Sequence, residues 1–303
     1  MINLSTGAFF ERGTQQIGSL RSQSEKLLKQ IGTGERLERS SDDPVAAARL
    51  RMLARNERIA SVDNRNSDLA EADLSLTDGT LTSIADVIVR VKELAVNGAN
   101  SSLSDDQRAA IGVEVASLRE TLLQLANARN ISGHALFGGQ ATGPAYVDNG
   151  TSIQYIGTAS KTPLEIGEGQ TVIPGMLGPD AFQFDTPAGQ TDLFAVLGGL
   201  AAALAVGGQT AVDASSTALG TLDAGLEKVT SAQTVVGSRL NWIDLMTERR
   251  ENVAERVAEE RSQVGGADIA TTMSRLKETM TILEATQASF SRLAELSLFN
   301  MLR

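Results

Sequence analysis

The chain has 303 residues, a formal net charge of −10, one histidine and no cysteine. Without cysteine it can form no disulfide, no thiolate nucleophile and no zinc–thiolate site. Aromatic residues make up only 4% of the sequence, which is typical of long helices packed on narrow apolar seams. The length and the apolar fraction of 42% suffice for about two domains with a sizeable core.

The N-terminal segment carries apolar residues at the two heptad positions of a helical seam: Phe10, Ile17, Leu20, Leu27 and Ile31. A seam of this kind predicts a helix that needs a helical partner. Burying its five large residues returns less free energy than ordering about thirty residues costs. We therefore expect the segment to be largely disordered in the free monomer and to be ordered by assembly.

A short polar stretch follows this segment. Gly32 and Gly34 lack the Gly-Lys-Ser/Thr of a phosphate loop, and we interpret them as a hinge. Asp42 and Asp43 precede Pro44, which is favoured at the first position of a helix. Paired carboxylates can serve acid–base or metal chemistry, but at a helix start they favour capping. We thus expect a helix cap formed by Asp42, Asp43 and Pro44.

Three helical stretches are predicted outside the middle of the chain. The first runs from Pro44 for roughly fifty residues, without an internal proline, and ends near Asn97. Ser104 and Gln107 form the pattern of a capping box and open an antiparallel partner. A third stretch covers about 213–263, and we interpret its charged run from Glu248 as a solvated face, with contact to a neighbouring subunit as the alternative.

The middle of the chain has a different composition. Five of the six prolines and half of the 28 glycines lie between residues 138 and 208. Short strands are expected at 152–156 and 171–173, and a short helix at 192–205. Nine acids against two lysines give residues 138–235 a charge of −7. That charge argues against nucleic acid and anionic membrane as partners.

The C-terminal segment repeats the pattern of the N-terminal one. Its seam residues are Ile269, Met273, Leu276, Met280, Leu283, Phe290 and Leu293, and the seam continues into Leu296 and Leu298. We expect the two terminal segments to pair when the protein assembles.

These patterns predict a mainly α-helical fold. It is a long antiparallel helical bundle or coiled coil built from both chain ends, with a small β-rich outer domain inserted at one end of the bundle. We expect terminal coiled-coil assembly segments at 1–42 and 265–303. A helical rod domain would comprise 43–137 and 206–264, and the β-rich outer insert with its short helix would comprise 138–205.

The sequence offers no catalytic residue, cofactor-binding residue or metal ligand, and no cofactor is expected. His134 is the single histidine, so no second imidazole can complete a metal pair or a catalytic triad, and we interpret it as a loop residue. The first twenty residues lack the apolar core of a cleaved signal peptide, and no apolar run of eighteen residues could cross a membrane. We therefore expect a non-enzymatic, self-assembling structural protein.

Several motifs resemble the bacterial flagellin superfamily. In the N-terminal half they are Ile31–Leu37, Ser40–Pro44 and Arg90–Val96, and in the C-terminal segment they are Ala267–Ala270 and Leu296–Arg303. The resemblance covers both helical thirds of the chain and leaves the middle free. It implies a subunit exported unfolded through the flagellar type III channel to the extracellular flagellum, with the insert facing outward.

The superfamily contains filament-forming flagellins and subunits of the hook–filament junction. Pro44 and the segments 133–139, 192–197 and 236–241 resemble the junction branch, whereas the ending Met301–Arg303 is similar to many flagellins. The resemblance implies a junction ring whose partners are further copies of the chain, a neighbouring hook-associated protein, flagellin and an export chaperone. Flagellin itself is the first alternative, and a cytoplasmic coiled-coil adaptor is the second.

Overall fold

The computed structural model describes residues 3–301, with side-chain positions for residues 7–8 and 10–293. The chain forms two compact units, which we call the terminal unit (residues 1–59 with 252–303) and the central unit (residues 60–251). Helices α2 (Pro44–Gly98) and α6 (Gly208–Gly265) contribute to both units. The three-part division expected from the sequence stays a prediction.

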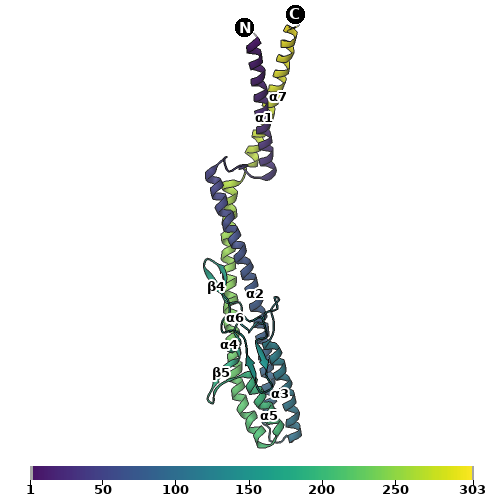
Figure 1. The fold of residues 1–303 in the computed structure, drawn as a ribbon, viewed down its shortest axis with the longest axis vertical. Helices are drawn as coiled ribbons and strands as arrows, with labels where there is room; N and C mark the ends of the chain where they lie inside the picture. Colours follow the sequence, from purple (N-terminus) through teal and green to yellow (C-terminus); the bar gives the residue numbers. More distant parts are fainter. Residues whose placement is uncertain (1–2, 302–303) are drawn as a thin grey trace. The chain divides into compact units, whose positions relative to one another are not determined.

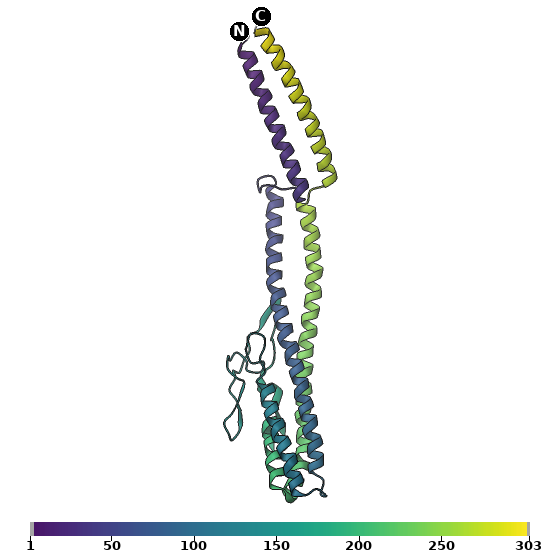
Figure 2. The same ribbon diagram turned by 90° about the vertical axis from the view of Figure 1, so that its right-hand side faces the viewer.

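The terminal unit contains a pair of antiparallel helices formed by the two chain ends. They are α1 (Asn3–Thr33) and α7 (Ile269–Met301), which lie side by side in both views (Figures 1 and 2). The first turns of α2 and the last turns of α6 complete this unit. There Arg49 and Arg261 form ion pairs with Glu260 and Glu57, and Leu53 is buried.

The central unit is built on four helical segments. Parts of α2 and α6 pack with α3 (Asp105–Ala126) and α5 (Leu193–Val206). The capping box predicted at Ser104 is confirmed, because its hydroxyl accepts a hydrogen bond from Gln107 N while the Gln107 side chain accepts one from Ser104 N. Asp192 caps α5 by accepting from Ala195 N at 2.8 Å, which confirms the predicted short helix.

Three antiparallel two-stranded hairpins and a short helix α4 (Gly178–Phe182) make up the β-rich part. The strands are β1 (Tyr146–Asp148), β2 (Ile153–Tyr155), β3 (Leu164–Gly167), β4 (Gln170–Val172), β5 (Gln183–Thr186) and β6 (Gly189–Asp192). The hairpins lie along the sides of α2 and α6, where α3 ends, and not at the end of the helical bundle (Figure 2). This placement corrects the expected insertion at one end.

One apolar core joins the hairpins to the helices of the central unit. At its centre Tyr146 contacts the rings of Phe182, Phe194 and Tyr155, with centroid separations of 5.8, 5.0 and 5.3 Å. The Phe137 ring lies 5.0 Å from that of Phe182. Because offset and edge-on aromatic contacts stabilise such clusters beyond their buried area, the few aromatic side chains of the chain fix the insert to the helices.

Gly112 allows α3 and α5 to approach closely. A Cβ built at this position would lie 3.1 Å from the carbonyl oxygen of Ala201 and 3.1 Å from Leu204 Cβ. Gly112→Val is therefore expected to lower the free energy of unfolding by about 1–3 kcal/mol through overpacking, measured as the denaturant midpoint. The matched control is Gly220→Ala in α6, where no atom lies within 4 Å of the added Cβ. This control should raise stability by about 0.5–1 kcal/mol, and equal effects of the two substitutions would contradict the close approach.

Candidate assembly surfaces

The contact between α1 and α7 is a narrow heptad seam. Leu27 and Leu276 are buried at 8% and 6% exposure. The half-buried apolar residues of the predicted seam are Phe10, Ile17, Leu20, Ile31, Leu283 and Phe290. The Phe10 and Phe290 rings meet edge to face with centroids 5.3 Å apart, beside Gly13, where a Cβ would lie 2.8 Å from the Phe290 ring. The seam thus joins the two ends of the chain to each other.

Polar residues occupy part of this seam. Ser24, Thr272 and Thr279 are each less than 9% exposed. The hydroxyls of Thr272 and Thr279 donate to the backbone carbonyls of Asp268 and Arg275, one helical turn earlier, at 2.7 and 2.8 Å. Because these two hydroxyls already have hydrogen-bond acceptors within α7, their burial in the seam costs little free energy. They form no hydrogen bond to α1, however. The apolar burial that holds the pair is accordingly small.

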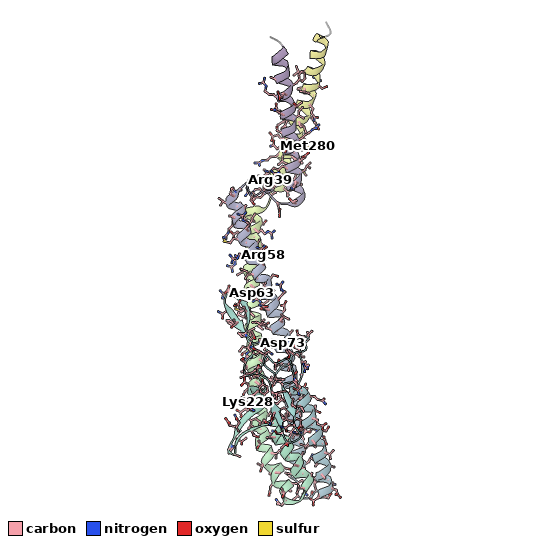
Figure 3. All side chains as sticks on the ribbon, in the orientation of Figure 1. Arg39, Arg58, Asp63, Asp73, Lys228 and Met280 are labelled. Carbon is pink, nitrogen blue, oxygen red and sulfur yellow. The ribbon has the colours of Figure 1, made fainter. Side chains whose placement is uncertain are left out.

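Four residues of the predicted seam lie elsewhere on α7. Ile269, Met273, Met280 and Leu293 are between 43% and 53% exposed, and Figure 3 shows Met280 on this helix. Each of them is thus only partly covered, which leaves apolar surface exposed beside the seam of α7. We call these four residues together the outer α7 face. Leu296 and Leu298 have no described side-chain positions.

Two triplets of exposed apolar residues lie on α2, where the sequence predicted a helix but no exposed apolar surface. Val45, Met52 and Ile59 lie seven residues apart in the terminal unit and are 47–80% exposed. Val62, Leu69 and Leu76 repeat this pattern in the central unit and are 42–58% exposed. Exposed apolar residues repeated every seven positions along a helix suit contact with another helix. The sevenfold spacing is the signal that could have identified them.

The connections at the base of the helix pair are held to each other by backbone hydrogen bonds. Arg36 N donates to the carbonyl of Gly265 at 2.7 Å, and Ala267 N donates to the carbonyl of Gly34 at 2.8 Å. Gly34 has a φ of +70°, a left-handed conformation that favours glycine, whereas Gly32 lies inside α1. These two backbone hydrogen bonds therefore hold the segment around Gly34, where the hinge is predicted, against residues 265–267.

Charged side chains add a second set of bonds to this joint. Asp43 accepts from Ala46 N at 3.0 Å and pairs with Arg36 at 3.2 Å, so it occupies the N-cap position of α2 directly before Pro44. Asp42 pairs with Lys26 at 3.2 Å and accepts from the backbone amides of the loop that precedes it. The hydrogen bond from Lys26 lowers the pKa of Asp42, and that from the Ala46 amide lowers the pKa of Asp43.

We expect these carboxylates to make the joint acid-sensitive. Because their folded-state pKa values lie below the ordinary 3.8, their stabilising contribution is complete above that pH and is lost as the pH falls through the lowered values. The assembled protein should remain stable from neutral pH down to about pH 5 and should dissociate below about pH 4, measured by pelleting. Asp43→Asn should weaken the assembly at neutral pH and flatten its acid dependence. Dissociation that begins above pH 5 would contradict this origin.

Part of the charged run in α6 is bound to the insert, which corrects its interpretation as a solvated face. Arg250 donates to Asn64 Oδ1, to the carbonyl of Ile166 in β3, and to the hydroxyls of Ser67 and Thr247. Apart from Thr247 of the same helix, these partners come from α2 and from a distant hairpin, so the sequence of the run gives no sign of them.

The described residues offer no metal-ligating group of three or more His, Cys, Asp or Glu side chains. His134 lies in the loop after α3, where its backbone N–H donates to Asn130 Oδ1 and its carbonyl accepts from Asn130 N. None of the described helices combines the length and the apolar character needed to span a lipid bilayer.

Known proteins share these sequence and structural features. Residues 5–142 match the family of the bacterial flagellin N-terminal helical region. Flagellar hook-associated protein 3 of Escherichia coli is 25% identical, with 99% of both chains aligned. A flagellin of Treponema pallidum is 23% identical over 97% of this chain and 95% of its own length.

The fold is also shared with a solved structure. The crystal structure of the flagellar junction protein FlgL from Legionella pneumophila superposes with a TM-score of 0.61 at 14% identity, covering 72% of this chain and 99% of that one. The predicted mainly α-helical fold with long antiparallel helices and small strand pairs is thereby confirmed. The resemblance to the bacterial flagellin superfamily inferred from the sequence motifs is confirmed as well, because the chain is similar to flagellar hook-associated protein 3 over nearly its whole length.

Proposed function

We propose that the chain is a structural subunit of the bacterial flagellum that forms the junction ring between hook and filament. The observation that carries this proposal is the pair of terminal helices, α1 and α7, whose narrow seam leaves the outer α7 face exposed. A surface of this kind suits contact with neighbouring subunits. The similarity to hook-associated protein 3 along the whole chain supports the same role.

In this proposal, folding of the chain ends and assembly are one event. Two helices of about thirty residues cannot be ordered by a single narrow seam, because the backbone entropy lost exceeds what that seam returns. Burial of the outer α7 face and of Val45, Met52 and Ile59 against neighbouring copies would supply the remainder. The free monomer would thus have largely disordered ends, a state suited to export unfolded through a type III channel with a chaperone as partner.

The test compares the full chain with a chain lacking residues 1–31 and 269–303. The full chain should gain helical circular dichroism on assembly onto a purified layer of the preceding hook-associated protein. The shortened chain should keep the central unit folded and fail to assemble. Assembly of the shortened chain would refute the proposed role of the ends and would favour a different class, such as a cytoplasmic coiled-coil adaptor.

Flagellin is the second candidate, favoured by the similarity to the Treponema pallidum filament protein over nearly the full chain. The two candidates differ in polymer length. A junction subunit extends the preceding layer by a ring and stops, whereas a flagellin grows long filaments from seeds. Electron microscopy of cells lacking the chain separates them further, since loss of the junction subunit should leave hooks without filaments. Neither role involves catalysis, and we propose no enzymatic activity.

A further inference from the structure

The cations of the acidic middle segment converge on one cavity. Lys161 and Lys228 are the only lysines between residues 138 and 235, and both line a cavity of about 520 Å3 in the central unit. Arg239 of α6 lines it as well, and Figure 3 shows Lys228 on the same helix. Asp180 is the single acid among the lining residues, and it is exposed. The most acidic part of the chain thus contains a cationic cavity.

The three cations have no carboxylate partner among the residues that the structure describes. Lys161 Nζ donates to the carbonyl of Leu136 at 3.3 Å, Arg239 donates to the carbonyl of Gly175, and Lys228 has neither an ion pair nor a hydrogen bond there. In contrast, Arg119 of the same unit, which is similarly half-buried, forms an ion pair with Asp148 at 3.1 Å. Half-buried positive charges without a counter-charge are costly.

Glycine at position 175 makes room for one of these cations. A Cβ there would lie 2.3 Å from Lys161 Nζ, and the residue has a φ of +126° that only glycine adopts readily. The ammonium group is therefore held against the backbone at the cavity. None of the described carboxylates forms an ion pair with it, and Asp73 acts on it only through longer-range attraction. Burial lowers the pKa of Lys161, and a bound anion would reverse this effect.

The remaining lining residues indicate the size and polarity of the ligand. Apolar side chains, among them Ile173, Met176 and Val235, line the cavity together with the cations. A guanidinium group binds a carboxylate through two parallel hydrogen bonds, and an ammonium group adds a further donor. The cavity volume falls within the range of small-ligand sites. A carboxylate on a short hydrocarbon chain matches both the cationic and the apolar parts.

We propose that this cavity is a binding site for a carboxylate carried on a short aliphatic chain, held by Lys161, Lys228 and Arg239. Such a group can come from an Asp or Glu side chain of a neighbouring copy or from a free carboxylic acid. The site itself is independent of the proposed junction role, because it lies within one central unit. Only its use by a neighbouring copy depends on self-assembly.

The test uses propionate as the probe and its neutral isostere propionamide as the control ligand, at constant ionic strength. Calorimetry on the full chain should give saturable binding of propionate with a Kd on the order of 1 mM, and none of propionamide. Trp242, the single tryptophan, lies one helical turn from Arg239 and offers a fluorescence signal for the same titration. Absence of saturable binding by calorimetry would overturn the proposal.

Variants identify the residues that hold the probe. Lys161→Met and Lys228→Met should each weaken propionate binding at least tenfold. Lys228→Met breaks no hydrogen bond among the described residues, so it should keep the parent's thermal unfolding midpoint, which is measured alongside. Arg58→Met, an exposed cation of α2 far along the sequence, is the matched control and should leave the Kd unchanged (Figure 3). Equal binding by all three variants would refute the site.

A second measurement identifies the source of the carboxylate. If propionate slows extension of the polymer by the parent chain but not by Lys161→Met, the natural ligand is a side chain of a neighbouring copy. If propionate binds without affecting extension, the ligand is a free acid. Both results support the site, and inhibition that is equal in the parent and the variant would contradict the assignment to this cavity.

Discussion

Leu276→Ala is expected to prevent extension of the polymer. Leu276 is the most deeply buried apolar residue in the described part of α7, at 6% exposure in a seam that contains little other apolar burial. Truncating a buried leucine costs about 2–5 kcal/mol. If pairing of α1 with α7 is coupled to assembly, this cost should raise the critical concentration by a factor of about 30 or more, since 1.4 kcal/mol corresponds to tenfold. The measurement is the concentration of unassembled chain after seeded extension.

Two neighbouring positions provide the controls for this prediction. Lys277→Ala changes the next residue, which is exposed and outside the seam, and should leave the critical concentration unchanged. Met273→Ala removes a side chain that is 53% exposed on the outer α7 face. It should weaken assembly less than Leu276→Ala, through contacts between subunits rather than within the helix pair. Normal extension by Leu276→Ala would show that the seam is not needed for assembly.

Arg250→Ala is expected to destabilise the central unit by about 2–4 kcal/mol, because hydrogen bonds to charged groups contribute more than neutral ones. In the parent chain the guanidinium of Arg250 donates to Asn64 Oδ1 at 2.7 Å, to Ser67 Oγ at 2.8 Å and to the carbonyl of Ile166. It thereby connects α2, α6 and the β3–β4 hairpin. Arg250→Lys should not restore stability, since an ammonium group lacks the planar fork that reaches all of these acceptors. Chemical denaturation measures the loss, and hydrogen exchange should locate it at the hairpin.

The adjacent arginine supplies a matched control. Arg249 pairs with Glu168 at 2.9 Å, but both side chains are about half or more exposed. Because exposed ion pairs contribute between 0 and about 1 kcal/mol, Arg249→Ala should change the unfolding free energy by less than about 1 kcal/mol. A loss as large as that of Arg250→Ala would show that local charge, and not the hydrogen-bonded connection, stabilises the hairpin.

The starts and ends of the helices were the features most accessible from the sequence. Pro44 begins α2, Ser104 caps α3 and Asp192 caps α5, and each effect depends on residues within four positions of the helix start. The strands at 153–155 and 170–172 were indicated by alternation and β-branching. Local chemistry determined these elements, so a single sequence was sufficient to predict them.

The directions that side chains face were harder to predict. A heptad spacing establishes that Val62, Leu69 and Leu76 share a face of their helix, but it does not say whether that face meets another helix or solvent. On α7 the seam combines Leu276 and Leu283 with threonines, where the sequence suggested methionines. The β5–β6 hairpin escaped prediction because its strands are mostly polar and lack a clear alternation. These features depend on contacts between distant segments.

Seeded assembly followed by electron microscopy tests most directly whether this chain is a junction subunit that assembles through its terminal helices. Purified layers of the preceding hook-associated protein are incubated with the full chain, with Leu276→Ala, or with the chain lacking both ends. The account predicts that the full chain adds a ring of defined length and that flagellin then extends it, whereas the other two chains add nothing. Long filaments grown by the full chain alone, or a ring formed by the shortened chain, would contradict it.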